Sequence, residues 1–289
     1  MAIEGPLVPR NVTTVLSLDD VRLAGRIVLY RVDVNSPLDP ATGAFLDDSR
    51  LRSILETLSD LSESKVVIMG HQSRPGKIDF TDMSGHCDRL SRLTGQQIRF
   101  VGDVCGDEAI EAIEEMQPGD KVFLDNVRMH PEEYGEHKVK AEDEPTSEIV
   151  TRLSSVADAY VTDAFGAAHR NSPTLTGFTE EVPCIAGRLM TKEIRSLSLA
   201  VNDPPRPYVA ILGGAKCDDS LRVALNLIGR GVVDSIVMVG VVGNLMLWAN
   251  GHDIGGTNKE AIKGMMGDDF ESTWETAQRL VKEHSELLF

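Results

Sequence analysis

Short apolar runs alternate along the chain with stretches in which apolar residues recur at helical spacing. The runs are rich in Val, Ile and Leu, each ends near Gly, Asn or Asp, and they occupy residues 26–32, 65–69, 121–124, 157–162, 208–212 and 234–239. Near-continuous apolar runs are typical of buried strands in a mostly parallel sheet that has helices on both faces. The pattern therefore predicts an α/β fold.

Two helices are predicted between these strands. Asp47, Asp48 and Ser49 offer N-cap oxygens before apolar residues at helical spacing, so we expect a helix that crosses from the first strand to the second. A second helix is expected over residues 186–201. The NDPPRP segment at residues 202–207 stops it, because proline removes a backbone donor and disfavours helical geometry in the residue before it.

This proline-rich stop is the best candidate for a domain boundary. We expect a first domain at residues 1–185, an interdomain helix at 186–202 and a second domain at 203–289. The second series of strands is short for an open sheet with its own core, and residues 286–289 resemble the start of a buried strand. The expected architecture is two Rossmann-like domains with mostly parallel sheets flanked by helices, the second domain being truncated.

One stretch of the first domain, residues 130–146, is polar and lacks periodicity. It predicts a solvated excursion from the fold. His130, His137 and the glutamates around them leave a metal site open as an alternative.

Composition argues against several classes of protein. A formal net charge of −16 over 289 residues argues against a nucleic-acid partner, which needs a clustered basic face. The longest nearly apolar run, residues 236–249, is interrupted by glycines and an asparagine and is too short for a membrane helix. The four cysteines form no C-x-x-C pair, and the first residues show no targeting pattern. We therefore expect a cytoplasmic protein with reduced thiols and no membrane partner.

Cationic side chains stand at or just beyond the ends of four successive predicted strands, where ligands bind in open α/β sheets. The polar residues at these ends are Arg31, Asp33 and Asn35, then His71 and Arg74, then Arg128, and finally His169 and Arg170. Arginine binds carboxylate and phosphate in bidentate fashion, and histidine titrates near neutrality. We therefore predict a pocket for a small polyanionic metabolite in the first domain. The alternative is that each arginine only pairs with a neighbouring acid.

A second candidate site begins the second domain, where a strand runs into Gly213, Gly214 and Lys216. Glycines let a backbone approach phosphates, the following helix offers free N–H groups, and the lysine adds a point charge. This predicts a phosphate cradle, with a tight turn as the alternative because the full G-x-x-x-x-G-K-[ST] pattern is lacking. Residues 240–244 resemble half of a dinucleotide fingerprint. An NAD-dependent oxidoreductase is nevertheless disfavoured, because no acidic residue ends a strand about twenty positions later.

Five segments resemble phosphoglycerate kinase in their order and spacing. They are YRVDVNSPL at residues 30–38, HQSRP at 71–75, DNVRMH at 125–130, YVTDAFGAAHR at 160–170 and LGGAK at 212–216. The similarity runs over essentially the whole chain, and the segment at residues 160–170 is the most specific.

The resemblance implies phosphoryl transfer between 1,3-bisphosphoglycerate and ADP, giving 3-phosphoglycerate and ATP, in either direction and with Mg²⁺. It implies a basic patch that binds 3-phosphoglycerate through Arg31, Asp33, Asn35, Arg50, His71, Arg74, Arg128 and Arg170, with His169 beside it. The implied catalytic residues are Arg50, which reaches the transferring phosphoryl group, and Lys216, which contacts the terminal phosphate of the nucleotide beside Gly213 and Gly214. Such a kinase is expected to be a monomer whose partners are these small molecules.

The chain departs from the commoner form of the family at several positions. Gln72 and Ser73 replace Leu-Gly, Ser220 replaces a second lysine, and Val241-Val242 interrupt a glycine run. These changes are similar to the archaeal branch of the family. Ten lysines against nineteen arginines, together with the acid excess, favour a halophilic origin. Loss of the fold in low salt would support that origin, and full stability in dilute buffer would contradict it.

Members of the family are also longer than this chain. The glycine-rich segment whose aspartate binds the Mg²⁺–nucleotide has no counterpart in the sequence, so no metal ligand is assigned. A non-catalytic fragment or remnant that holds 3-phosphoglycerate without transferring phosphate stays open as the alternative.

Overall fold

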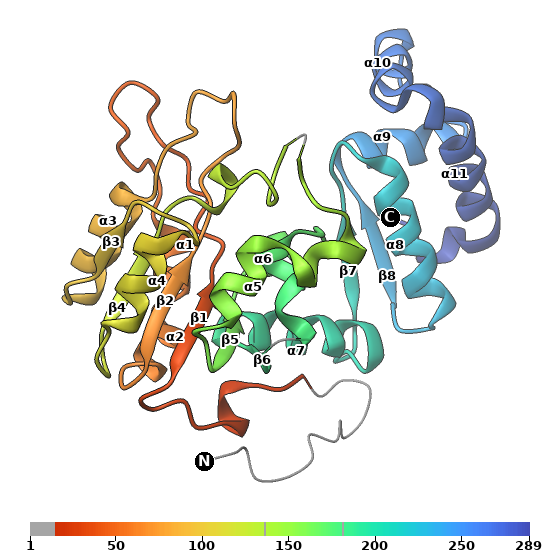
Figure 1. Cartoon of the computed structure of the whole chain (residues 1–289). Coiled ribbons are helices and arrows are strands. Elements are labelled where there is room, and N and C mark those ends of the chain that lie inside the picture. Colours follow the sequence, from red (N-terminus) through yellow and green to blue (C-terminus); the bar gives the residue numbers. More distant parts are fainter. Residues whose placement is uncertain (1–14, 136, 181) are drawn as a thin grey trace. The chain divides into compact units, whose positions relative to one another are not determined.

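The computed structural model describes residues 15–135, 137–180 and 182–289. The chain divides into two compact units, Met1–Ile194 and Arg195–Phe289, and the division falls inside helix α7 (Arg188–Asn202). Each unit is an α/β structure with a parallel sheet, which confirms the fold class expected from the apolar runs (Figure 1).

The sheet of the first unit has six strands in the order β3-β4-β2-β1-β5-β6, and every neighbouring pair is parallel. Its strands are β1 (Ile27–Arg31), β2 (Lys65–Met69), β3 (Arg99–Val101), β4 (Lys121–Leu124), β5 (Ala159–Thr162) and β6 (Cys184–Ala186). The four longer strands coincide with predicted runs. The pattern missed β3 and β6, because strands of three residues give too few positions for an apolar run to stand out.

Helices cover both faces of this sheet. Successive side chains of a strand point to opposite faces, so Val28 and Tyr30 pack in one core with α1, α2 and α3, while Leu29 packs in a second core with α4 and α5. The helices of the unit are α1 (Ser49–Ser53), α2 (Leu55–Asp60), α3 (Ser84–Thr94), α4 (Asp107–Glu114), α5 (Glu148–Ser154), α6 (Pro173–Thr176) and the start of α7. The single helix expected after β1 is two short helices that meet at Ile54.

The polar stretch at residues 130–146 differs from its prediction. It contains a 3₁₀ helix, η3 (Ala141–Thr146), and the side chains of Glu133 and Glu144 are buried. Hydroxyl groups explain the burial of Glu133, which accepts from Ser172 and Thr174. Thr176 donates to Oε2 of Glu144, whereas Glu144 Oε1 is buried without a hydrogen-bond partner among the described residues. The expectation of a solvated excursion was therefore wrong for these two residues.

A buried carboxylate, Asp163, joins β5 to three other elements. It accepts hydrogen bonds from the Tyr30 hydroxyl (2.6 Å), from the Thr57 hydroxyl (2.6 Å) and from the Met190 backbone N–H (2.9 Å). Burial, followed by the charge of Asp163, raises the pKa of Tyr30 well above its ordinary value, which keeps the phenol protonated as a donor. A methyl group at Gly187 would lie 2.2 Å from the Asp163 carboxylate, so only glycine fits there.

The second unit has a smaller sheet of two parallel strands, β7 (Val209–Leu212) and β8 (Ser235–Met238). Its core is closed by α8 (Cys217–Gly229), α9 (Gly240–Ala249), α10 (Gly256–Met266) and α11 (Phe270–His284). Residues 286–289, expected to begin a strand, are partly in a 3₁₀ turn, η7 (Ser285–Leu287), after which Leu288 forms a parallel bridge with Ile236. None of the helices that the structure describes combines the length and the apolar character needed to cross a membrane.

The close approach at Gly187 makes a prediction about stability. Gly187→Ala forces its methyl group against Asp163, and we expect a loss of about 1–3 kcal/mol in the free energy of unfolding. The matched control is Gly85→Ala in α3, where nothing lies within 4 Å of the added methyl group, and there we expect a gain of up to about 1 kcal/mol. Urea unfolding of both variants measures this, and equal effects would contradict the proposed packing.

Candidate functional site

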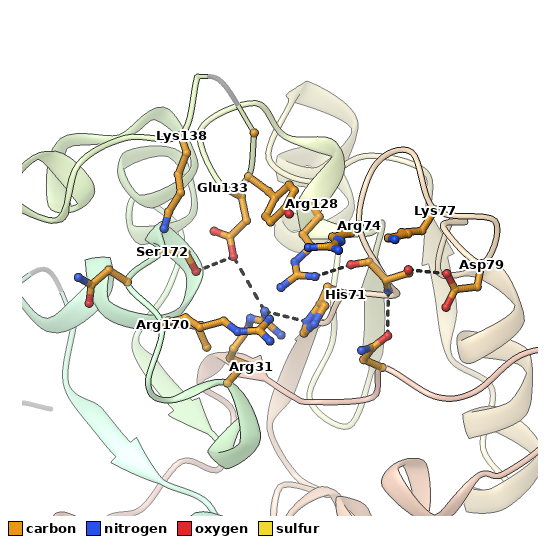
Figure 2. Close-up of a pocket in the computed structure, with 17 residues that line it drawn as sticks. Arg31, His71, Arg74, Lys77, Asp79, Arg128, Glu133, Lys138, Arg170 and Ser172 are labelled. Carbon is orange, nitrogen blue, oxygen red and sulfur yellow. Dashed lines mark hydrogen bonds and ion pairs between the residues drawn. The ribbon is translucent and has the colours of Figure 1, made fainter. Parts of the chain in front are cut away.

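Four strand ends of the first unit meet at one pocket of about 890 Å³. Arg31 is the last residue of β1, His71 follows β2, Arg128 lies in the turn after β4, and Arg170 follows β5. The carboxyl ends of parallel strands lie at the same edge of a sheet, and the strand order changes direction at β1, which is where α/β folds bind ligands. Figure 2 shows that these side chains point into the same space.

The structure brings most of the predicted substrate-binding residues together and leaves others outside. Those that line the pocket are Arg31, Asn35, His71, Arg74, Arg128 and Arg170. Three do not line it, namely Asp33, Arg50 and His169. His169 is exposed and accepts a weak hydrogen bond from Arg170 (3.4 Å).

The pocket is strongly cationic in a chain that is acidic overall. Its wall carries six Lys or Arg side chains and two carboxylates. In the described part of the chain, Arg74, Arg128 and Arg170 have no carboxylate within 4 Å, whereas Arg31 lies 3.9 Å from Glu133 and Arg50 lies 2.5 Å from Asp33. Simple pairing with neighbouring acids therefore accounts for two of the predicted arginines and not for the three others.

Burial and mutual repulsion act on these cations. The pKa of Arg128 is lowered from its ordinary value, first by burial and then by the charges of Arg170 and Arg31. The Arg128 side chain is nevertheless held in place, since it donates to the Ser73 carbonyl and lies 4.9 Å from the centre of the Tyr134 ring. An anion that entered the pocket would relieve this repulsion.

His71 is a neutral member of the pocket. Its ring is 2% exposed, and its pKa is lowered to about 2, first by burial and then by the charge of Arg31, with smaller contributions from Arg128, Arg170 and Arg50. At neutral pH this histidine therefore offers hydrogen bonds to a ligand and adds no charge.

The loop after β2 is held in an unusual backbone conformation at Ser73. Its φ angle is 55°, a region that glycine adopts more easily than residues with a side chain. Three hydrogen bonds stabilise Ser73 in this backbone conformation. Its N–H donates to Asn35 (2.8 Å), its hydroxyl donates to Asp79 (2.6 Å), and its carbonyl accepts from Arg128. The buried Gln72 also ties this loop to Ser36. Arg74 thus projects from a firmly anchored turn.

Arg50 and Asp33 form a separate pair in the first unit. The Arg50 guanidinium donates to Asp33 Oδ2 (2.5 Å), and about half of the Arg50 side chain is exposed. A methyl group at Gly166 would lie 2.5 Å from the same oxygen, so glycine is required for this approach. The arrangement leaves a half-exposed cation whose direction is set by Asp33.

Several pocket residues were not predicted from the sequence. They are Ser73, Lys77, Asp79, Glu133, Tyr134, Lys138 and Ser172. Lys77 and Lys138 stand on opposite sides of the pocket in Figure 2. Lys77 comes directly after the HQSRPG segment, three positions from Arg74. This closeness to Arg74 could have identified Lys77 as a pocket residue from the sequence. Lys138 and Glu133 lie in the aperiodic stretch and carry no such signal.

The alternative metal site in this stretch gains no support. His130 lies 3.9 Å from the carboxylates of Glu132 and Glu148. Across residues 15–135, 137–180 and 182–289, no group of three or more His, Cys, Asp or Glu side chains is placed to hold a metal ion.

The second candidate site lies in the second unit, where β7 leads into α8. Gly213 packs closely against the turn that follows β8, and a methyl group on Gly213 would lie 2.6 Å from the Val239 side chain. Gly214 has a φ angle of 119°, which favours glycine. Lys216 is the exposed N-cap residue of α8, and Ser220 donates to the Gly213 carbonyl (3.2 Å). The turn therefore presents an exposed lysine beside the free N–H groups of a helix N-terminus, as a phosphate cradle requires.

Relatives of the chain are found by sequence. It is 42% identical over 255 residues to a phosphoglycerate kinase of Methanocorpusculum labreanum, an alignment that covers 88% of this chain and 62% of the relative. It is 44% identical over 254 residues to that of Methanosarcina mazei, covering 88% of this chain and 60% of the relative. Both relatives are archaeal, as the departures at Gln72 and Ser73 predicted. The chain spans about 60% of the length of these curated relatives.

Solved structures and a family model agree with the sequence matches. The crystal structure of phosphoglycerate kinase from Pyrococcus horikoshii superposes with a TM-score of 0.84 at 34% identity, covering 94% of this chain and 66% of that one. The enzyme from Coxiella burnetii shares the fold, with a TM-score of 0.69 at 24% identity, covering 96% of this chain and 66% of that one. A family model described as phosphoglycerate kinase matches residues 18–287, and the chain therefore belongs to the phosphoglycerate kinase family.

Proposed function

We propose that the pocket of the first unit binds 3-phosphoglycerate. This small acid carries a carboxylate at one end and a phosphate at the other, and both groups bind arginine through charge-assisted hydrogen bonds. The observation that carries the proposal is that Arg74, Arg128 and Arg170 converge on one pocket without carboxylate partners in the described chain. His71 and Asn35 add neutral hydrogen-bonding groups to the same wall.

We further propose that the chain contributes to a kinase that transfers a phosphoryl group between ATP and the carboxylate of 3-phosphoglycerate. Residues 1–185 would be the acid-binding domain, 186–202 the interdomain helix and 203–289 part of the nucleotide-binding domain. The glycine turn and Lys216 fit the phosphates of ATP or ADP. Mg²⁺ bound with the nucleotide would neutralise phosphate charge. We assign no ligand to it, since no suitable cluster occurs among the described residues.

The proposed chemistry needs positioned positive charge more than a protein nucleophile. In phosphoryl transfer the charge is spread over the equatorial oxygens of the moving group, and cations aimed at them stabilise the transition state. Arg50 fits this role, because Asp33 orients its guanidinium and half of the side chain stays accessible. Within the second unit, Lys216 fits the terminal phosphate of a bound nucleotide, because it is exposed at the N-terminus of α8.

A second candidate function is binding of 3-phosphoglycerate without phosphoryl transfer. The observation that favours it is that the cationic pocket lies entirely within the first unit and needs no residue of the second. A coupled assay with ATP and 3-phosphoglycerate separates the two candidates. Turnover by this chain supports the kinase. If this chain binds 3-phosphoglycerate without turnover while a chain extended to the length of its relatives turns it over, the second candidate is supported. If neither chain shows turnover when purified and folded, the kinase is excluded.

The unpaired arginines make a prediction about binding. Arg128→Ala removes charge-assisted hydrogen bonds worth about 1.5–3 kcal/mol, so the affinity for 3-phosphoglycerate should fall about tenfold to a hundredfold. Arg99→Ala is the matched control, because it removes the same charge from an exposed pair with Glu115 outside the pocket. Calorimetric titration measures both. An equal loss in the two variants would show that only the net charge matters, and no loss in Arg128→Ala would refute the pocket.

Arg50 makes a prediction about turnover. Arg50→Ala should lower kcat more than about tenfold, which corresponds to roughly 1.4 kcal/mol in the barrier, with a smaller effect on the affinity for 3-phosphoglycerate. Arg52→Ala, two residues along the same helix and paired with Asp48, is the control and should keep its activity. The assay uses this chain or, if it binds without turnover, the extended chain. A fall of less than tenfold would remove Arg50 from the catalytic residues.

A further inference from the structure

The guanidinium of Arg31 is almost fully engaged by the protein itself. Its Nε–H donates to the Thr174 hydroxyl (2.9 Å), Nη1 contacts the carbonyls of Val32 (2.5 Å) and Met69 (3.5 Å), and Nη2 lies 3.3 Å from Nδ1 of His71. These contacts occupy four of the five N–H groups that a guanidinium carries. Arg31 therefore has little capacity left for direct contact with a ligand.

The contact with His71 determines where the imidazole proton lies. A guanidinium has only donors, so Nδ1 of His71 must be the acceptor and carries no hydrogen. The neutral ring then carries its hydrogen on Nε2. A protonated imidazole would need a hydrogen on Nδ1, directed at the Arg31 donor, and this geometry opposes it.

The charges around His71 act in the same direction. The charged groups that face it are Arg31 from β1, Arg128 from the turn after β4, Arg170 from the turn after β5 and Arg50 from α1. All four are cations, and together with burial they lower the pKa of His71 to about 2. Glu133 lies across the Arg31 guanidinium in Figure 2.

Nε2, at the opposite edge of the imidazole, has no partner in the described protein. His71 lines the pocket although the residue is only 2% exposed, and no hydrogen bond from its Nε2 to another described group of the chain is found. Arg31 is in turn held by Glu133, a buried carboxylate that accepts from the hydroxyls of Ser172 (2.9 Å) and Thr174 (2.6 Å). Contacts thus run from Glu133 through Arg31 to His71.

We propose that Arg31 is a positioning residue: held by Glu133 and Thr174, it donates to Nδ1 of His71 and thereby fixes the imidazole as the neutral Nε2–H tautomer, a directed hydrogen-bond donor for the anion in the pocket. The identity of that anion as 3-phosphoglycerate rests on the proposed function. The tautomer does not, because it follows from contacts within the ligand-free protein.

Nitrogen NMR of the ligand-free, isotope-labelled chain tests the tautomer directly. The ring signals of His71 are assigned among the seven histidines by their loss in His71→Asn. We expect a single neutral form with hydrogen on Nε2, unchanged from about pH 5 to 8. Hydrogen on Nδ1, a mixture of tautomers, or a midpoint near the ordinary value of about 6.5 would overturn the proposal.

A double variant tests whether Arg31 is the cause. Arg31→Met together with Glu133→Gln removes both charges of the buried pair, whereas losing one partner would leave an unpaired buried charge. In the folded double variant we expect His71 to show both tautomers and a raised pKa. A single Nε2–H form in that variant would show that other groups fix the ring. If the variant does not fold, the measurement on the unchanged chain still decides the tautomer.

Binding then tests the role of Glu133. Glu133→Gln and its control Glu115→Gln each remove one carboxylate, that of Glu133 from the pocket wall and that of Glu115 from an exposed pair outside it, and charge alone predicts no loss of 3-phosphoglycerate binding in either. If Glu133 positions Arg31, its variant binds about tenfold more weakly or worse, while Glu115→Gln does not. Tighter or unchanged binding in Glu133→Gln would refute the positioning role. A wild-type chain that does not bind 3-phosphoglycerate contradicts the proposed function and leaves the NMR result standing.

Discussion

The charge of Arg31, buried at the end of the central strand, is the constraint on which the pocket depends. A parallel sheet brings the ends of β1, β2, β4 and β5 to one edge, and in this chain each end supplies a cation or a histidine. Such groups repel one another strongly where water is excluded. Glu133, Thr174 and two backbone carbonyls offset the charge of Arg31, so the remaining arginines can stay unpaired and available to an anion.

Much of this arrangement could be predicted from the sequence, because the rule that locates it is simple. Buried parallel strands appear as apolar runs, and ligands bind beyond their carboxyl ends. That reasoning, without any structure, singled out Arg31, His71, Arg128 and Arg170, and the structure places all four in one pocket. The resemblance to the family added Arg50, which no strand-end rule would select.

The remaining features depend on contacts between distant residues. Glu133 lies in a polar, aperiodic segment, and its burial is explained by the hydroxyls of Ser172 and Thr174 and by the Thr174 N–H, about forty residues away. The strands β3 and β6 are three residues long and show no usable period. Asp33 and Arg50 form their own pair beside Gly166 and do not line the pocket. Pairings of this kind are set by tertiary structure and leave no local pattern.

We propose that the first unit holds a preformed site for 3-phosphoglycerate, and a crystal structure of the chain with this compound would show it. We expect the ligand in the pocket at the ends of β1, β2, β4 and β5, with its anionic groups on Arg74, Arg128 and Arg170 and one oxygen accepting from Nε2 of His71. Ligand bound elsewhere, or an empty pocket in crystals that hold a large excess of 3-phosphoglycerate, would contradict this.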